Sequence, residues 1–162
     1  MNFSSAYSAL SHAPIDLLII GIFFLLVAAD ALRAGSIRAA ALALSLPLSS
    51  LLYQMVAQTV LLSTIVGQFS KGFEQAILFF LIEAVLFVCL HQMLSSFERY
   101  TSLLSAVVSG LAATVVVLVV WTQTPVLQSV WHFGPQIEAL FGAPYRFFWF
   151  MASYLALAFL AS

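Results

Sequence analysis

The fold is decided by residues 73–94, which read FEQAILFFLIEAVLFVCLHQML. After Glu74 near its start, this stretch holds one charged residue, Glu83, inside a run of large apolar side chains. A helix that crosses the hydrocarbon core of a bilayer needs about 20 predominantly apolar residues. Strands of a membrane β-barrel are about half that length and alternate polar with apolar side chains. Residues 73–94 therefore predict a membrane-spanning helix.

The composition of the whole chain agrees with this prediction. Of its 162 residues, 64% are hydrophobic and 7% are charged, whereas soluble domains carry about 25% charged residues. So few polar side chains cannot cover a surface that faces water, and a net charge of −1 gives no basic surface for nucleic acid. The chain is predicted to be one integral membrane domain over residues 1–162, an all-α polytopic transmembrane bundle of four to five helices. These lie at about 15–33, 37–66, 73–95, 103–122 and 145–161.

Residues 122–144 form the longest gap between the apolar stretches. Prolines and glycines break this segment, but it still contains large apolar residues such as Trp131, Phe133 and Leu140. We expect a loop that lies along the membrane surface, with a short helix at 136–141. The stretch that follows, 145–161, is at the lower limit of spanning length, so it either crosses the membrane or lies partly in its interface.

Basic residues predict the orientation of the bundle. Arg33 and Arg38 lie in the connection between the first two helices, and Arg99 lies between the third and the fourth. Loops rich in Lys and Arg stay in the cytoplasm, so these connections are predicted inside and the N-terminus outside. Asp30 is three residues before Arg33 on the same helix face, a spacing that suits a local ion pair. The favoured interpretation of these charges is that they reach to the cytoplasmic headgroups, and the alternative is a contact with a partner or a lipid.

Glu83 is the candidate functional group inside the membrane. A carboxylate at the middle of a spanning helix costs about 3 kcal/mol on insertion scales, although its apolar neighbours offset that cost. It is either a proton or substrate site, or a carboxyl group that holds helices together through hydrogen bonds. By depth, the expected partners are Ser45, Ser49 and Ser50 on the second helix and Thr114 on the fourth.

The second helix also carries a stripe of polar side chains. The stripe recurs every three to four residues, which places much of it on one helical face. It consists of Ser45, Ser49, Tyr53, Gln54 and Gln58. The stripe is either the lining of a wet path or a seam of hydrogen bonds between helices, and the seam is the favoured interpretation.

Small residues recur every four positions along the fourth helix. Ser105, Ser109 and Ala113 form one such row, and Gly110 belongs to the row beside it. Small side chains allow the backbones of two membrane helices to approach closely. The pattern predicts a packing surface, either within the chain or between copies of it.

The chain shows no pattern typical of an enzyme or a metal site. His12, His91 and His132 are far apart in the sequence and lack the spacing of metal ligands. Paired acids at a membrane edge, a Gly-rich phosphate loop and a nucleophile motif are not found. We therefore expect a protein that is not an enzyme and that binds no metal or cofactor.

The first two predicted helices resemble the start of the colicin V production protein family. Members of that family open with an aspartate just before the first helix, and Asp16 stands in that position. A basic turn of the type Gly-x-x-Arg then leads into their second helix, and here Gly35 and Arg38 form that turn, with Arg33 before it. The resemblance implies a small multi-pass protein of the bacterial cytoplasmic (inner) membrane.

The resemblance also implies a function without catalysis. It points to envelope homeostasis or to toxin production and export, through other membrane proteins or self-association within the lipid bilayer. The alternative is a small transporter or channel subunit that uses Glu83 as an intramembrane titratable site. A third possibility is an accessory subunit that stabilises a larger membrane complex.

Overall fold

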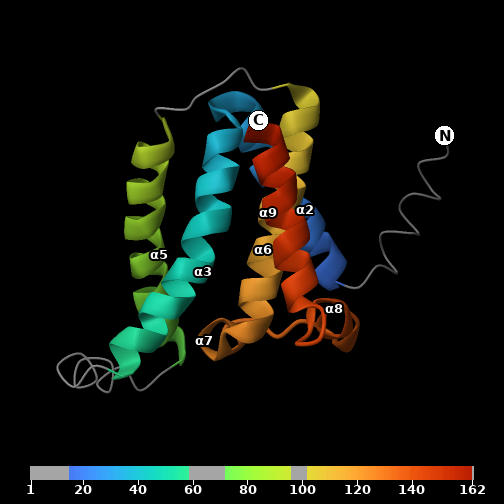
Figure 1. Ribbon diagram of the computed structural model, residues 1–162. Helices are drawn as coiled ribbons and strands as arrows, with labels where there is room; N and C mark the ends of the chain where they lie inside the picture. Colours follow the sequence, from blue (N-terminus) through green and yellow to red (C-terminus); the bar gives the residue numbers. More distant parts are fainter. Residues whose placement is uncertain (1–14, 59–71, 96–101, 162) are drawn as a thin grey trace.

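The computed structural model describes residues 15–58, 72–95 and 102–161, and this part of the chain is almost entirely helical (Figure 1). Its helices are α2 (Ile15–Ala34), α3 (Ser36–Gln58), α5 (Gly72–Leu94), α6 (Leu103–Gln123), α7 (Pro125–Gln128), α8 (Pro135–Phe141) and α9 (Arg146–Ala161). Helices α2, α3, α5 and α6 are long and apolar enough to cross a membrane. The predicted all-α membrane bundle is confirmed, and the chain is an integral membrane protein by the length and composition of these helices.

The helix boundaries agree with the predicted ones to within a residue or two, except in the second helix. There α3 ends at Gln58, and the rest of the stretch predicted to extend to residue 66 lies outside the described residues. The short helix expected at 136–141 is confirmed as α8. Helix α7 was not predicted, although Pro125 at its first turn is a common start signal for a helix.

Helix α6 is the centre of the bundle. It packs against α2, α3 and α9, while α5 lies on the far side of α3 (Figure 1). Over an 18-residue apolar stretch of α6, 56% of the residues are buried, against 11% over the corresponding stretches of α2 and α5. Since only the buried faces need to match neighbouring helices, the exposed apolar faces of α2 and α5 are the surfaces offered to lipid.

A close contact between α2 and α6 explains one of the small residues. A Cβ atom on Gly110 would lie 3.0 Å from both the Cα and the Cβ atom of Ala28, so any larger residue would crowd this approach. Ser109 and Ala113 are fully buried beside it. The surface predicted from small residues is thus used, at Gly110, for packing within the chain.

Ser105 has a different role from the other small residues of α6. It lies in the first turn and is only partly buried. Its backbone N–H donates to Oγ of the N-cap residue Ser102 at 3.1 Å, and its own hydroxyl donates to the Ser102 carbonyl at 2.8 Å. Ser105 therefore belongs to the cap of the helix.

A proline inside α3 is compensated by a side chain from α9. Pro47 has no N–H, so the carbonyl oxygen of Ala43, four residues earlier, loses its partner within the helix. The hydroxyl of Tyr154 donates to that oxygen at 3.0 Å. Since an unpaired backbone group is costly inside a membrane, this bond fastens α9 to α3.

Tyr154→Phe should destabilise the protein by about 1 kcal/mol, because the Ala43 carbonyl then has no donor. In a Pro47→Ala background the residue at 47 supplies its own N–H to that carbonyl, and the same Tyr154→Phe change should cost less. The free energy of unfolding of the four variants in mixed detergent micelles measures the difference. An equal cost in both backgrounds would show that Tyr154 does not act through Ala43.

Helix α9 stands along α6 and does not lie flat at the end of the bundle. It runs back from α8, and its C-terminal end lies at the same end of the bundle as the α2–α3 connection (Figure 1). Its 16 residues give a length of about 24 Å, somewhat short of the ~30 Å hydrocarbon core. Helix α9 is shorter than the four helices long enough to span, so a crossing by residues 145–161 stays a prediction.

Candidate functional site

Glu83 is the middle residue of α5 and faces α3. Ala76 and Phe79 precede it by seven and four residues, so all three lie on one face of the helix. This face is enclosed: Glu83 is 7% exposed, Ala76 2% and Phe79 0%. The opposite face, with residues such as Leu81 and Val85, is exposed. The carboxyl group is thus held between two helices at mid-height of the bundle.

Two serines of α3 bind the two carboxyl oxygens of Glu83. The distance from Ser45 Oγ to Oε1 is 2.5 Å, and that from Ser49 Oγ to Oε2 is also 2.5 Å. The serines are one helical turn apart and both are 0% exposed. The contacts expected for Ser45 and Ser49 are therefore present, and each oxygen has its own hydroxyl.

The other two expected partners lie elsewhere. The Ser50 hydroxyl is 3.2 Å from that of Thr124, at the end of α6. The Thr114 hydroxyl donates to the carbonyl of Gly110 in its own helix at 2.8 Å. Their assignment to Glu83 was wrong, because a shared depth in the membrane does not ensure that two side chains face each other.

The hydrogens of the two serines restrict the chemistry of the site. Ser45 Oγ also lies 3.1 Å from the Leu42 carbonyl, and Ser49 Oγ lies 2.9 Å from the Ser45 carbonyl. A hydroxyl has one hydrogen, so each serine can donate either to Glu83 or to its own helix. If Glu83 is ionised, both serines donate to it. If Glu83 is protonated, it donates to one serine, which then turns its own hydrogen to the backbone.

An aromatic pair closes one side of this site. The rings of Tyr53 and Phe79 meet edge to face with their centroids 6.0 Å apart. Tyr53 follows Ser49 by one turn on α3, and Phe79 precedes Glu83 by one turn on α5. Both rings are buried, so their apolar packing covers the carboxyl group on this side.

The Gly-x-x-Arg turn joins α2 to α3 and forms an ion pair. Gly35 has a φ of 91°, a backbone conformation that residues other than glycine rarely adopt. Arg38 Nη1 lies 3.2 Å from Asp30 Oδ1, and both side chains are about half exposed. The ion pair of Asp30 is thus with Arg38 and not with Arg33, which is exposed at the end of α2. An exposed pair of this kind contributes about 0–1 kcal/mol.

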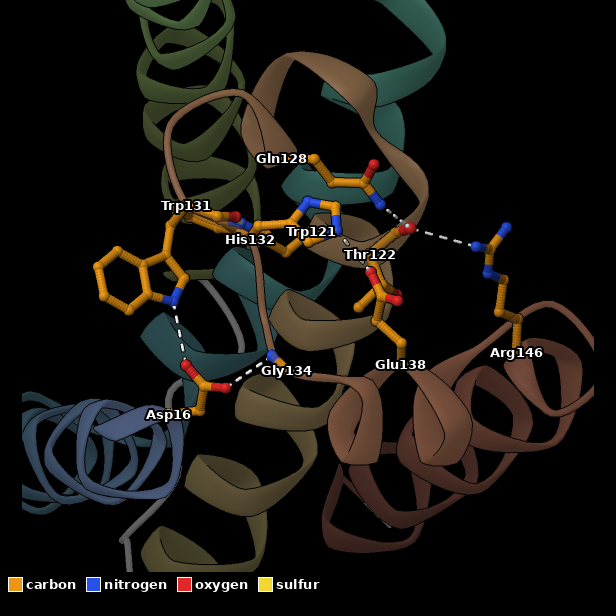
Figure 2. Close-up of polar contacts among 9 residues, drawn as sticks. All are labelled: Asp16, Trp121, Thr122, Gln128, Trp131, His132, Gly134, Glu138 and Arg146. Carbon is orange, nitrogen blue, oxygen red and sulfur yellow. Dashed lines mark hydrogen bonds and ion pairs between the residues drawn. The ribbon is translucent and has the colours of Figure 1, made fainter. Parts of the chain in front are cut away.

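Asp16 ties the start of α2 to the segment between α7 and α8 (Figure 2). Its Oδ2 accepts the backbone N–H of Gly134 at 2.6 Å, and its Oδ1 accepts the indole N–H of Trp131 at 3.3 Å. A side chain at position 134 would be crowded, since a Cβ atom there would lie 2.9 Å from Oδ2. The aspartate that suggested the family resemblance therefore anchors a loop in this structure.

A second set of contacts holds the same loop. The indole N–H of Trp121 donates to the carbonyl of Trp131 at 2.9 Å, and Nε2 of His132 lies 3.2 Å from Glu138 (Figure 2). Phe133 is buried against α6. The Trp121 hydrogen bond and the packing of Phe133 thus hold the segment after α6 against the end of the bundle. Neither contact was predicted, because both depend on how the chain turns after α6 ends.

Comparisons with protein-family models, curated proteins and solved structures find no match to this chain. The resemblance to the colicin V production family therefore stays a prediction based on the residues of the first two helices.

Proposed function

We propose that the chain is a non-catalytic multi-pass protein of the bacterial inner membrane that acts by binding other membrane proteins or further copies of itself. Its setting is envelope homeostasis or toxin production and export. The observation that carries a structural role for Glu83 is its environment: both carboxyl oxygens have a serine partner, and the group is 7% exposed. Glu83 is then a hydrogen-bonded tie between α3 and α5.

The tie has a consequence for the outer face of α5. Because α5 packs mainly on α3, its opposite side is a broad apolar surface that includes Ile77, Phe80, Leu81, Val85 and Val88. Fixing α5 to α3 fixes the position of this surface. A rigid apolar helix face is suited to packing against a helix of another membrane protein.

The proposed orientation has the N-terminus outside and the α2–α3 connection in the cytoplasm. Its support is Arg33 and Arg38, which lie at one end of the bundle. Helix α9 ends at this same end (Figure 1), so the C-terminus is also cytoplasmic in this proposal.

The second candidate function is a small transporter that uses Glu83 to carry a proton. It is favoured by the chemistry of the serine pair, which can bind both the ionised and the protonated carboxyl group by turning its hydroxyls. Intramembrane acids of this kind occur in proton relays.

Proton flux into liposomes separates the two functions. We expect the wild-type protein to give no more flux than protein-free liposomes when a membrane potential is imposed, and Glu83→Gln to give the same result. Glutamine keeps the size and hydrogen bonding of the side chain but cannot ionise. Glu74→Gln, near the start of α5, is the matched control. Flux in the wild type and in the Glu74 variant that disappears in Glu83→Gln would establish the transporter instead.

A further inference from the structure

A second polar site lies at the end of the bundle where α6 ends and α9 begins. A cavity of about 360 Å³ opens there between α3, α6 and α9. Its polar lining consists of Ser50, Gln54, Gln123 and Arg146, and among the described residues the rest of the lining is apolar and includes no carboxylate. A concave site with a few converging polar groups is the usual form of a small-ligand site.

Arg146 is fixed on one side and unsatisfied on another. Its Nη2 donates to the carbonyl of Thr122 at 3.2 Å, and the same carbonyl accepts Gln128 Nε2 at 2.6 Å (Figure 2). Thr122 is in the last turn of α6, where carbonyls lack partners within the helix. The Nε atom of Arg146 is buried and has no hydrogen-bond partner in the described part of the chain. The guanidinium is thus held in place by Thr122, while its hydrogen-bonding capacity is only partly used by the described residues.

Arg146 also forms no ion pair with another residue in the described part of the chain. Arginine stays protonated at any physiological pH. Two acids at this end of the bundle have other partners: Asp16 binds Trp131 and Gly134, and Glu138 lies against His132. Glu74, at the start of α5, does not line the cavity. A positive charge beside two amide side chains, in a cavity whose described lining includes no carboxylate, is an environment for an anion.

We propose that this cavity binds a phosphate group, with Arg146 as the charged donor and the amides of Gln54 and Gln123 beside it. Arg146 begins α9, so the cavity lies at a helix end, where the headgroup layer of a bilayer is located. Guanidinium groups bind phosphate oxygens through charge-assisted hydrogen bonds. The phosphate comes either from a phospholipid headgroup or from a free phosphate ion. This site is independent of the role proposed for Glu83.

The test measures binding of two probes to the purified full-length protein in detergent. One probe is a short-chain phosphatidylglycerol, followed by native mass spectrometry, and the other is inorganic phosphate, followed by the shift of the unfolding temperature. Arg146→Gln should weaken binding about tenfold, because it removes a charge-assisted hydrogen bond. The matched control is Arg33→Gln, which removes the same charge from an exposed position at the other end of the bundle.

Gln54→Leu keeps the test informative if Arg146→Gln weakens the fold, since Gln54 is exposed and lines the cavity from α3. The proposal expects both cavity variants to lose affinity while Arg33→Gln does not. Binding of the lipid alone then identifies a headgroup site, and binding of inorganic phosphate identifies a site for the free ion. No binding of either probe, or an equal loss in Arg33→Gln, would overturn the proposal.

Discussion

Replacing Ser45 and Ser49 together by alanine should destabilise the bundle by about 2–3 kcal/mol. The double variant leaves both oxygens of Glu83 without a donor, while the carboxyl group stays enclosed between α3 and α5. A buried polar group without a partner costs about 1–3 kcal/mol, and more when it is charged. We expect α5 to separate from α3 at a lower concentration of denaturing detergent, measured as the midpoint of unfolding in mixed micelles.

Ser109→Ala is the control for this prediction. Ser109 is fully buried like the two serines, but its hydroxyl donates to the Ala106 carbonyl of its own helix at 3.1 Å. Ser109→Ala removes a serine hydroxyl, as the other two substitutions do, but leaves no other side chain without a partner. Its cost should therefore stay below about 1 kcal/mol. If the double variant is no less stable than Ser109→Ala, the two serines do not support Glu83.

The second large effect is expected at Gly110. Gly110→Leu should prevent α2 and α6 from packing, with a loss of about 3 kcal/mol or more, since even the first added carbon would lie 3.0 Å from the Cα and Cβ atoms of Ala28. Neither of these atoms is the flexible end of a side chain, so the two helices must move apart. Gly110→Ala should give a smaller loss of about 1–3 kcal/mol.

Gly21 provides a matched comparison in α2. Apart from the backbone of its own helix and its two chain neighbours, no heavy atom lies within 4 Å of a Cβ atom at this position, so Gly21→Leu meets open space. The free energy of unfolding should be nearly unchanged, because the leucine side chain has room at this position and leucine is not a poorer helix former than glycine. Equal losses at the two glycines would mean that α2 and α6 do not approach as closely as described.

Much of the fold follows from the length of the apolar stretches. A bilayer sets the length of a spanning helix, so α2, α5 and α6 could be placed from hydropathy with small errors. Proline and glycine positions also predicted α8 correctly. Depth suggested four partners for Glu83, and the two that contact it, Ser45 and Ser49, are one turn apart on one face of α3.

The rotation of each helix about its axis was harder to predict. A helix that is apolar on every side has no polar face to mark its exposed side, so the sequence does not say which residues face a neighbour. Ser50 follows Ser49 directly but faces Thr124, because adjacent residues are about 100° apart around a helix. The same uncertainty hid the bond from Tyr154 to Ala43.

Contacts between loops and helix ends were not predictable. Asp16 binds Gly134 and Trp131, more than a hundred residues away along the chain. Asp30 binds Arg38 across the turn at Gly35, although Arg33 is closer in the sequence. In both cases the partner depends on how the chain turns after a helix ends, and hydropathy contains no information on that direction.

Glu83 and its two serines are expected to stabilise the bundle as a unit. The most direct test is the coupling free energy between them, obtained from the stability of the wild type, Ser45→Ala/Ser49→Ala, Glu83→Leu and the triple variant. In Glu83→Leu the serines can donate to the carbonyls of Leu42 and Ser45, so removing them should then cost little. We expect a coupling free energy of at least about 1 kcal/mol. If the serine substitutions cost the same with Glu83 as with leucine at that position, Glu83 and the serines do not act as a unit.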